Sequence, residues 1–293
     1  MTRFARFAAI DWSGAVGQRH HGIAVALCEA DGGPPHLMQI GNRWSRQEVL
    51  EWLLGDLPSD ALVGLDLGIS LPFADAGAFF PGWRESPPDA RGLWRLVDEI
   101  CAEEPHLAAT SFVDHPQLSR YFRRHAGREG DRFHLGNAGH KRGRFRVTEE
   151  HQAAAGCRPY SNFNLVGAAQ VGKSSLTGMR VLHRLGDAIP VWPIDPLPEA
   201  GPVIVEIYTA LAALAAGRSA SRTKMTDLEA LNAALANLGS PAIRGAGAID
   251  DHSADALLTA AWLRSVADRP ALWRPPALSP RIARTEGWTF GAT

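Results

Sequence analysis

The chain has 293 residues, a formal net charge of −1 at neutral pH and 45% hydrophobic residues. Such a length forms one large domain or two ordinary ones, and it buries a substantial core without disulfides. The nearly balanced charge excludes a global electrostatic attraction to nucleic acid or to membranes, so any such preference has to be local.

The spacing of the cysteines and the length of the apolar segments indicate the cellular compartment. Cys28, Cys101 and Cys157 lie far apart without CxxC spacing, which argues against a zinc site or a disulfide framework. No apolar segment approaches the roughly 18 residues of a membrane helix, and the first apolar stretch is too short for a signal peptide. We therefore expect a soluble, cytoplasmic protein that does not enter a membrane.

Strand-like runs open the chain and are separated by the turn signals "SGAVGQRH" and "DGGPP". They cover residues 4–11, 20–30 and 35–41. Three short strands joined by tight turns are typical of an antiparallel meander.

A helix and a buried strand follow the meander. Ser45 followed three residues later by Glu48 indicates a capping box, and the apolar spacing predicts a helix over residues 45–57. Residues 61–69 are a short apolar run interrupted by Asp66, as in a parallel strand covered on both faces.

From about residue 70 to residue 202 the chain is irregular and rich in Pro, Gly and Arg, with helices expected around 89–104 and 174–185. Regularity returns after that point. The expected elements are a strand at 202–208, an amphipathic stretch at 225–239 and a helix at 250–267. We predict a core from residues 1–69 and 203–270, a partly helical, basic insertion at 70–202, and a tail at 271–293 that wraps the surface.

This element order predicts an α/β, RNase H-like mixed sheet, in which an antiparallel meander continues into parallel strands flanked by helices. The first strand and the later parallel strands run side by side in that fold. Asp11, Asp66 and Glu206 are therefore expected to meet at one end of the sheet, where open α/β sheets carry their sites.

The last helix supplies a fourth acid. At helical spacing, Asp255 lies on the stripe of Leu258 and Trp262, which faces the core. His252 and Asp251 flank the same stripe. Clustered carboxylates repel one another unless divalent cations neutralise them, so the pattern predicts oxygen-ligated Mg²⁺ or Mn²⁺, with Asp251 as a further candidate ligand.

The motifs "AAIDWSGA", "VGLDLGISLPF", "VIVEIYTA" and "DDHSADALLTAAW" resemble a family of predicted RNase H-like nucleases in the group that contains the RuvC resolvases. The resemblance implies a two-metal nuclease in which Asp11 bridges both ions and Asp66 and Glu206 hold one each. It implies that Asp255 and His252 complete the site. Residues 18–21 ("QRHH") match no motif of that family.

One stretch, residues 120–146, combines many arginines with aromatic residues and is the candidate surface for nucleic acid. Arg142, Arg144 and Arg146 are its candidate phosphate contacts. The simpler interpretation is a solvated basic loop.

Several alternatives stay open from the sequence. Gly167–Ser174 ("GAAQVGKS") satisfies the P-loop pattern with Lys173 as its lysine, although no clear strand precedes it, and Lys173 alone could contact a substrate phosphate. The chain could instead be an actin-like nucleotide phosphatase or ATPase, or a metal- or nucleic-acid-binding protein without turnover. Asp11 could be a turn residue, and Asp251 or its neighbour Asp250 could be a helix cap. The substrate stays open between DNA, RNA, a junction and a small nucleotide.

Overall fold

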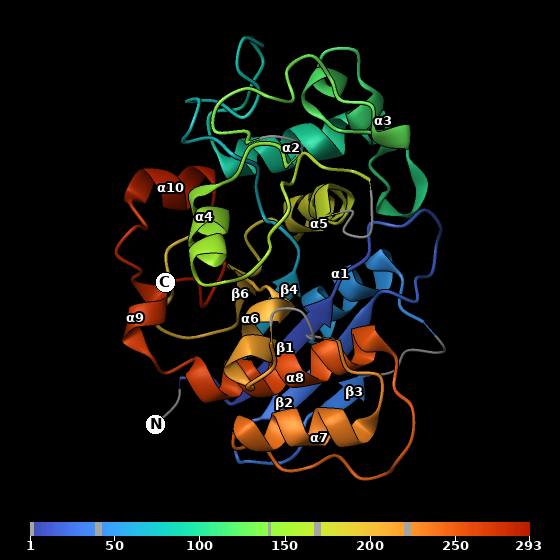
Figure 1. The fold of residues 1–293 in the computed structure, drawn as a ribbon, viewed down its shortest axis with the longest axis vertical. Coiled ribbons are helices and arrows are strands. Elements are labelled where there is room, and N and C mark those ends of the chain that lie inside the picture. The colour runs from blue at the N-terminus through green and yellow to red at the C-terminus, as the bar shows by residue number, and fades with distance from the viewer. Residues whose placement is uncertain (1–2, 39–42, 140–141, 167–170, 220–223) are drawn as a thin grey trace.

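A single six-stranded mixed sheet forms the centre of the described chain (Figure 1). The computed structural model describes residues 3–38, 43–139, 142–166, 171–219 and 224–293. The strands are β1 (Arg6–Asp11), β2 (Ala24–Glu29), β3 (His36–Met38), β4 (Ala61–Asp66), β5 (Val191–Trp192) and β6 (Val203–Glu206). Their order across the sheet is β3-β2-β1-β4-β6-β5.

Both kinds of strand pairing expected from the sequence are present. β2 pairs antiparallel with β1 and with β3, which forms the meander. β4 pairs parallel with β1 and with β6, and β5 extends the parallel part. The mixed α/β sheet is thereby confirmed, while β5 was not expected because it has only two residues.

Helices lie on both sides of this sheet, some against the strands and others outside those helices. They are α1 (Arg46–Gly55), α2 (Ala90–Ile100), α3 (Thr110–Asp114), α4 (Val147–Ala154), α5 (Val171–Leu185), α6 (Thr209–Ala215), α7 (Leu228–Asn237), α8 (Asp251–Val266), α9 (Pro270–Trp273) and α10 (Pro280–Thr285). The predicted capping box starts α1, because Glu48 N–H donates to Ser45 Oγ and Ser45 N–H donates to the Glu48 carboxylate. In the described residues, no helix combines the length and the apolar character needed to span a bilayer.

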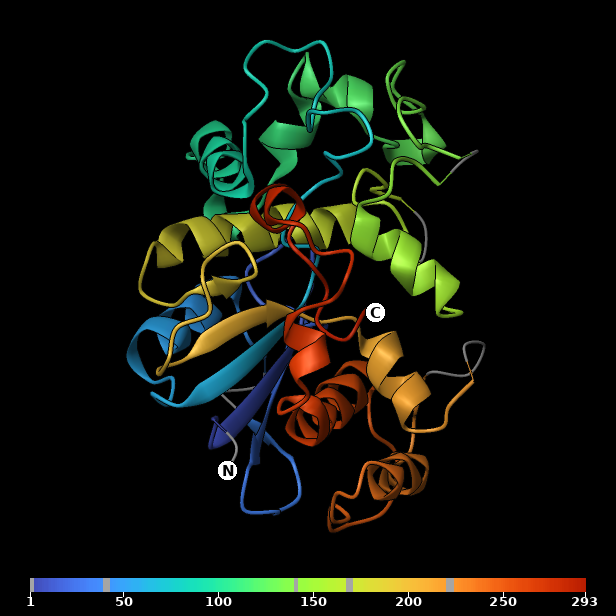
Figure 2. The same cartoon turned by 90° about the vertical axis from the view of Figure 1, so that its left-hand side faces the viewer.

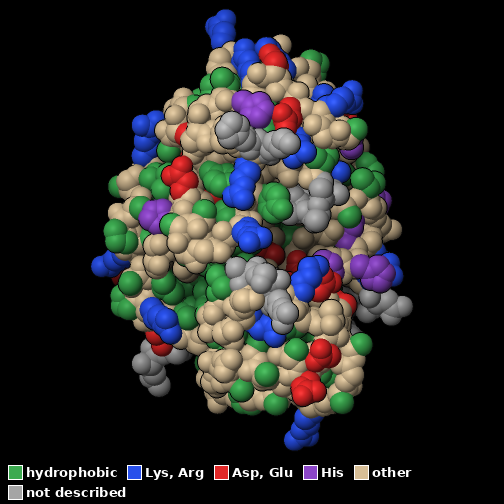
Figure 3. Space-filling model, viewed as in Figure 1, with side chains coloured by type: hydrophobic (Ala, Val, Ile, Leu, Met, Phe, Trp, Pro, Cys, Tyr) green, Lys and Arg blue, Asp and Glu red, His purple; other side chains and the backbone are tan. Residues whose placement is uncertain are grey.

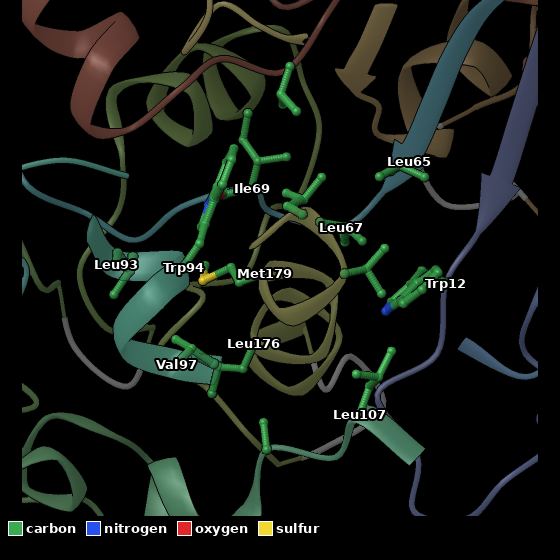
Figure 4. Close-up of a cluster of buried hydrophobic side chains, with 14 of the residues drawn as sticks. Trp12, Leu65, Leu67, Ile69, Leu93, Trp94, Val97, Leu107, Leu176 and Met179 are labelled. Carbon is green, nitrogen blue, oxygen red and sulfur yellow. The ribbon is translucent and has the colours of Figure 1, made fainter. Parts of the chain in front are cut away.

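The sheet separates two hydrophobic cores. On one face α1 and α5 pack against the strands, with α2 outside α5; on the other face α8 lies across β1 and β2 (Figure 2). Figure 4 shows α5 surrounded by apolar side chains, with Trp12 and Leu67 on its sheet side and Trp94 from α2 on the other. Alternate residues of each strand thus enter different cores.

The C-terminal segment is part of the second core. Trp288 and Phe290 are fully buried, and the Phe290 N–H donates to the Glu206 carbonyl at 2.8 Å. The expectation that the tail only wraps the surface is therefore wrong, since these large apolar side chains gain more by burial than by lying on the outside. The division into core, insertion and tail stays a prediction.

Two arginines of the basic stretch are structural. The Arg144 side chain is 1% exposed and pairs with the Asp75 carboxylate at 2.6 Å, while Arg146 is equally buried. Only Arg142 of the three is exposed. The expected role in phosphate contact is therefore wrong for Arg144 and Arg146, because their guanidinium groups are enclosed and already neutralised.

Replacing Arg144 tests this conclusion. Arg144→Ala leaves the buried Asp75 carboxylate without its cation, and we expect the free energy of unfolding in urea to fall by about 3–5 kcal/mol. The matched control Arg142→Ala, at an exposed position, should change it by less than about 0.5 kcal/mol. Equal effects of the two substitutions would contradict the structural role.

Candidate active site

The register between β1 and β4 places two acids side by side. In this parallel pair Asp11 is the partner of Asp66, so the two residues are neighbours on strands about 4.8 Å apart. Paired residues on adjacent strands point to the same face. That face is the one under α8, because Ala9 and Leu62, which lie an even number of positions before Asp11 and Asp66 and so point to the same face, belong to the core of α8.

Helix α8 brings further polar groups to this face. Its N-cap is Asp250, whose carboxylate accepts the Ser253 N–H at 2.9 Å. In the first turn of the helix, His252 Nδ1 lies 2.9 Å from Asp11 Oδ2. Asp255 follows on the same side and interacts electrostatically with Asp11. The expected meeting of β1, β4 and the last helix at one site is thus present in the described residues.

The three carboxylates disfavour one another's charge. Burial, followed by the charges of Asp11 and Asp255, raises the pKa of Asp66 well above its usual range. Burial, followed by the charge of Asp11, raises the pKa of Asp255 to about 7. Within the described part of the chain, neither Asp66 nor Asp255 has an ion-pair partner. The described residues therefore do not stabilise the ionised forms of Asp66 and Asp255, so these carboxyl groups tend to keep their protons unless a cation binds beside them.

Asp11 differs because it has a cationic neighbour. Burial raises the pKa of Asp11, and the hydrogen bond with His252 opposes that rise. The same hydrogen bond raises the pKa of His252 to about 9. His252 is therefore protonated at neutral pH while it contacts Asp11.

Glu206 points to the opposite face of the sheet. The β4–β6 register pairs Glu206 with Leu65, whose side chain lies in the core of α1 and α5. There its carboxylate accepts two hydrogen bonds from Arg146, at 2.6 and 2.8 Å, and one from the Ile69 N–H at 2.9 Å. The charge of Glu206 is thus already neutralised by Arg146. The expectation that Glu206 is a metal ligand equivalent to Asp11 and Asp66 disagrees with the register, which turns its side chain to the other face.

Asp251 also has a cationic partner outside the group of three carboxylates. Its carboxylate pairs with Lys224, and this contact lowers the pKa of Asp251. Across the described residues, no group of three or more His, Cys, Asp or Glu side chains is arranged to hold a metal ion. Asp11, Asp66 and Asp255 fit Mg²⁺ or Mn²⁺ in donor chemistry and charge, but their present side-chain positions do not form a complete coordination shell.

A cavity of about 510 Å³ opens at this end of the sheet. Asp66, Glu206 and His252 line it, together with the loop after β1 and the first turn of α5. Figure 3 shows acidic side chains deep in a hollow near the middle of the molecular surface in view, with histidine beside them. Asp66 and Glu206 therefore border a cavity that opens to the outside.

The first turn of α5 contains the end of the P-loop-like motif. Lys173 and Ser174 lie in this turn, whereas residues 167–170 of the motif lie outside the described residues. A side chain at Gly14 would clash with the backbone of Lys173 and Ser174, so the loop after β1 lies directly against this turn. In residues 157–166 no strand precedes the motif, which differs from a P-loop.

Sequence reasoning missed one feature of the cavity wall. Glu149, in the first turn of α4, binds the Arg146 guanidinium at 2.9 Å, so Arg146 serves both Glu149 and Glu206. Burial, with an added contribution from Glu206, raises the pKa of Glu149 to about 7. The only local signal was the position of Glu149 three residues after Arg146, where a helix-capping acid is expected.

Comparison of the chain with protein-family models, with curated proteins and with solved structures finds no match. The site is therefore interpreted from its own geometry.

The raised pKa of Glu149 predicts a pH-dependent stability difference. A carboxyl group with a higher pKa in the folded than in the unfolded state contributes stability that is complete below about pH 4.3 and is lost as pH rises through about 7. Glu149→Gln mimics the neutral form and lacks this loss. Between pH 5 and pH 8, the unfolding free energy of Glu149→Gln should therefore rise relative to the unsubstituted protein by up to about 3 kcal/mol.

Thermal and urea unfolding at several pH values measure this difference, and taking the variant relative to the unsubstituted protein cancels the titration of other groups. A difference that does not change with pH would show that Glu149 stays ionised throughout.

Proposed function

We propose that the chain is a metal-dependent phosphodiesterase of the RNase H-like nuclease type, with Asp11, Asp66 and Asp255 as its catalytic carboxylates. The observation that carries the proposal is the in-register pairing of Asp11 with Asp66, of which Asp66 lines an open cavity and both interact electrostatically with Asp255. Three mutually repelling carboxylates cost folding free energy, and a divalent cation removes that cost. A purely structural role gives no reason for this arrangement.

The strand order is a second line of support. A meander whose first strand lies between an antiparallel and a parallel neighbour, followed by another parallel strand, is the arrangement expected of an RNase H-like sheet. In such a sheet, acids at the ends of the first and fourth strands adjoin acids of the last helix. Asp11, Asp66 and Asp255 occupy these positions.

A bound Mg²⁺ or Mn²⁺ would supply activation of water and stabilisation of the leaving oxygen. The described residues supply the remaining functions. His252 lines the cavity and carries a proton at neutral pH, so it can donate a hydrogen bond to a phosphate oxygen. The first turn of α5 borders the same cavity at Ser174, where the helix dipole favours a negatively charged group.

The proposed substrate is a nucleic acid or a nucleotide, because the chemistry is phosphodiester hydrolysis. Tyr160 lines the cavity and is 46% exposed, which suits an aromatic side chain that stacks on an unpaired base. Arg158, two residues earlier, is also exposed and is in a position to contact the sugar-phosphate backbone of a nucleic acid. Tyr160 and Arg158 thus replace the buried Arg144 and Arg146 as the proposed contacts to nucleic acid.

Thermal shift with Mn²⁺ compares one acid from each face of the sheet. Asp66→Asn relieves repulsion and removes a ligand, so it should fold at least as stably without metal and lose the Mn²⁺-induced rise in melting temperature. Glu206→Gln should lower the metal-free free energy of unfolding by about 1–3 kcal/mol, because it weakens the bonds to Arg146, yet it should keep the Mn²⁺ response. At 100 times the dissociation constant, Mn²⁺ should stabilise the unsubstituted protein by about 2.7 kcal/mol.

The activity itself is tested with labelled single-stranded, duplex, hybrid and branched substrates in Mn²⁺. We expect EDTA and Asp66→Asn each to abolish cleavage. Cleavage that persists in Asp66→Asn, or a protein that neither binds Mn²⁺ nor cleaves any of these substrates, would refute the proposed function.

A further inference from the structure

A second cavity, of about 370 Å³, lies between α1, the loop after β1 and the segment that follows α2. Arginines from three separate parts of the chain line it, namely Arg19, Arg46 and Arg184. Arg19 belongs to the "QRHH" stretch, for which the proposed nuclease function gives no role.

Arg46 is the buried floor of this cavity. Its side chain is 1% exposed, and its partners are three backbone carbonyls: Nε donates to Ser13 O at 3.1 Å, one terminal nitrogen to His106 O at 2.8 Å, and the other to Ala15 O. No carboxylate among the described residues pairs with it. A guanidinium has five N–H groups, so two are left for another acceptor.

An enclosed cation with only neutral partners is costly. Burial, with a further contribution from the nearby Arg180, lowers the pKa of Arg46 to about 10. Carbonyl groups compensate its charge only in part, whereas an anion would do so fully. Arg46 therefore has an unmet requirement for negative charge.

The acids around the cavity do not meet this requirement. Glu48 accepts the Ser45 N–H at 2.8 Å and binds Arg19 at 2.9 Å, and Glu104 accepts the Thr110 N–H at 2.9 Å. One acid that does not line the cavity, Asp98, is shared by two arginines, Arg180 at 2.8 Å and Arg184 at 3.2 Å. The cavity and its surroundings thus hold four arginines and three carboxylates, so one positive charge is left over. These groups are Arg19, Arg46, Arg180 and Arg184, and Glu48, Asp98 and Glu104.

Backbone strain is concentrated at the same place. His106 and Leu107 both line the cavity and adopt left-handed φ angles of 57° and 54° without being glycine. Such conformations cost about 1–3 kcal/mol each and persist where the surroundings hold them. The bond from Arg46 to His106 O is one such restraint.

We propose that this second cavity binds a phosphoryl group, held by Arg46 at its floor and by Arg19 and Arg184 at its rim. A phosphate oxygen pair matches the planar fork of a guanidinium, and its negative charge would compensate the positive charge that is left over. The group comes either from a small phosphorylated molecule or from the backbone of a nucleic acid. This site is independent of the proposed hydrolysis, because it requires neither metal nor the acids of the first cavity.

The second cavity lies against the same loop as the first cavity, so a ligand in one can affect the other. Arg46 holds the carbonyls of Ser13 and Ala15, and both residues also line the cavity that contains Asp66. A phosphoryl group at Arg46 would therefore sit on the other side of a loop that begins directly after Asp11 and Trp12. Occupancy of one cavity should affect the position of the loop in the other.

Binding is measured in EDTA, so that the acids of the first cavity play no part. Inorganic phosphate is titrated by calorimetry and thermal shift against chloride at equal ionic strength, and a single-stranded oligonucleotide is titrated in parallel by fluorescence anisotropy. The test variant is Arg19→Ala/Arg184→Ala, whose side chains are partly exposed and whose removal leaves Arg46 and Arg180 in place. Its matched control is Arg95→Ala/Arg120→Ala, which also removes two arginines from surface ion pairs.

We expect the test variant to bind about tenfold or more weakly than the unsubstituted protein, and the control to bind unchanged. Loss confined to inorganic phosphate assigns the site to a small phosphorylated molecule. Loss confined to the oligonucleotide assigns it to a nucleic-acid backbone. Arg46→Lys, which keeps the charge but not the fork, should weaken whichever ligand binds. The proposal is overturned if neither ligand binds above the chloride control, or if the test and control variants weaken binding equally.

Discussion

The in-register parallel pairing of β1 with β4 is the constraint on which the candidate site depends. It aligns Asp11 with Asp66 and turns both toward α8, where Asp255 and His252 meet them. Side chains alternate along a strand, so a slip of one residue would send Asp66 into the opposite core. The apolar residues that precede both acids oppose such a slip, because each of them would have to leave one packed core and repack in the other.

The two faces of the sheet end treat acidic charge in opposite ways. On the α1 and α5 face, Glu206 and Glu149 share the buried Arg146, which ties β6 to α4. On the α8 face, Asp66 and Asp255 have no comparable cation among the described residues. Compensation on one face ties the cavity wall together, and the lack of a comparable cation on the other is the basis of the metal site proposed above.

The loop after β1 connects the two cavities physically. Gly14 lies against the first turn of α5, and Arg46 holds the carbonyls of Ser13 and Ala15 from the other side. A loop fixed at both sides transmits a change in either contact, since tightly packed segments cannot deform gradually. The two proposed sites would therefore be coupled through a few atoms.

The sequence alone determined the local features: the meander, the capping box at Ser45, the cap of α8 and the acids that end β1 and β4. These follow from turn residues, caps and apolar periodicity, which act over a few positions. Tertiary structure alone decided which face Glu206 occupies and that Arg144 is enclosed. The face depends on the register with β4, and the burial of Arg144 depends on Asp75, 69 residues away in the chain. A pattern within one segment carries no information about such a distant partner.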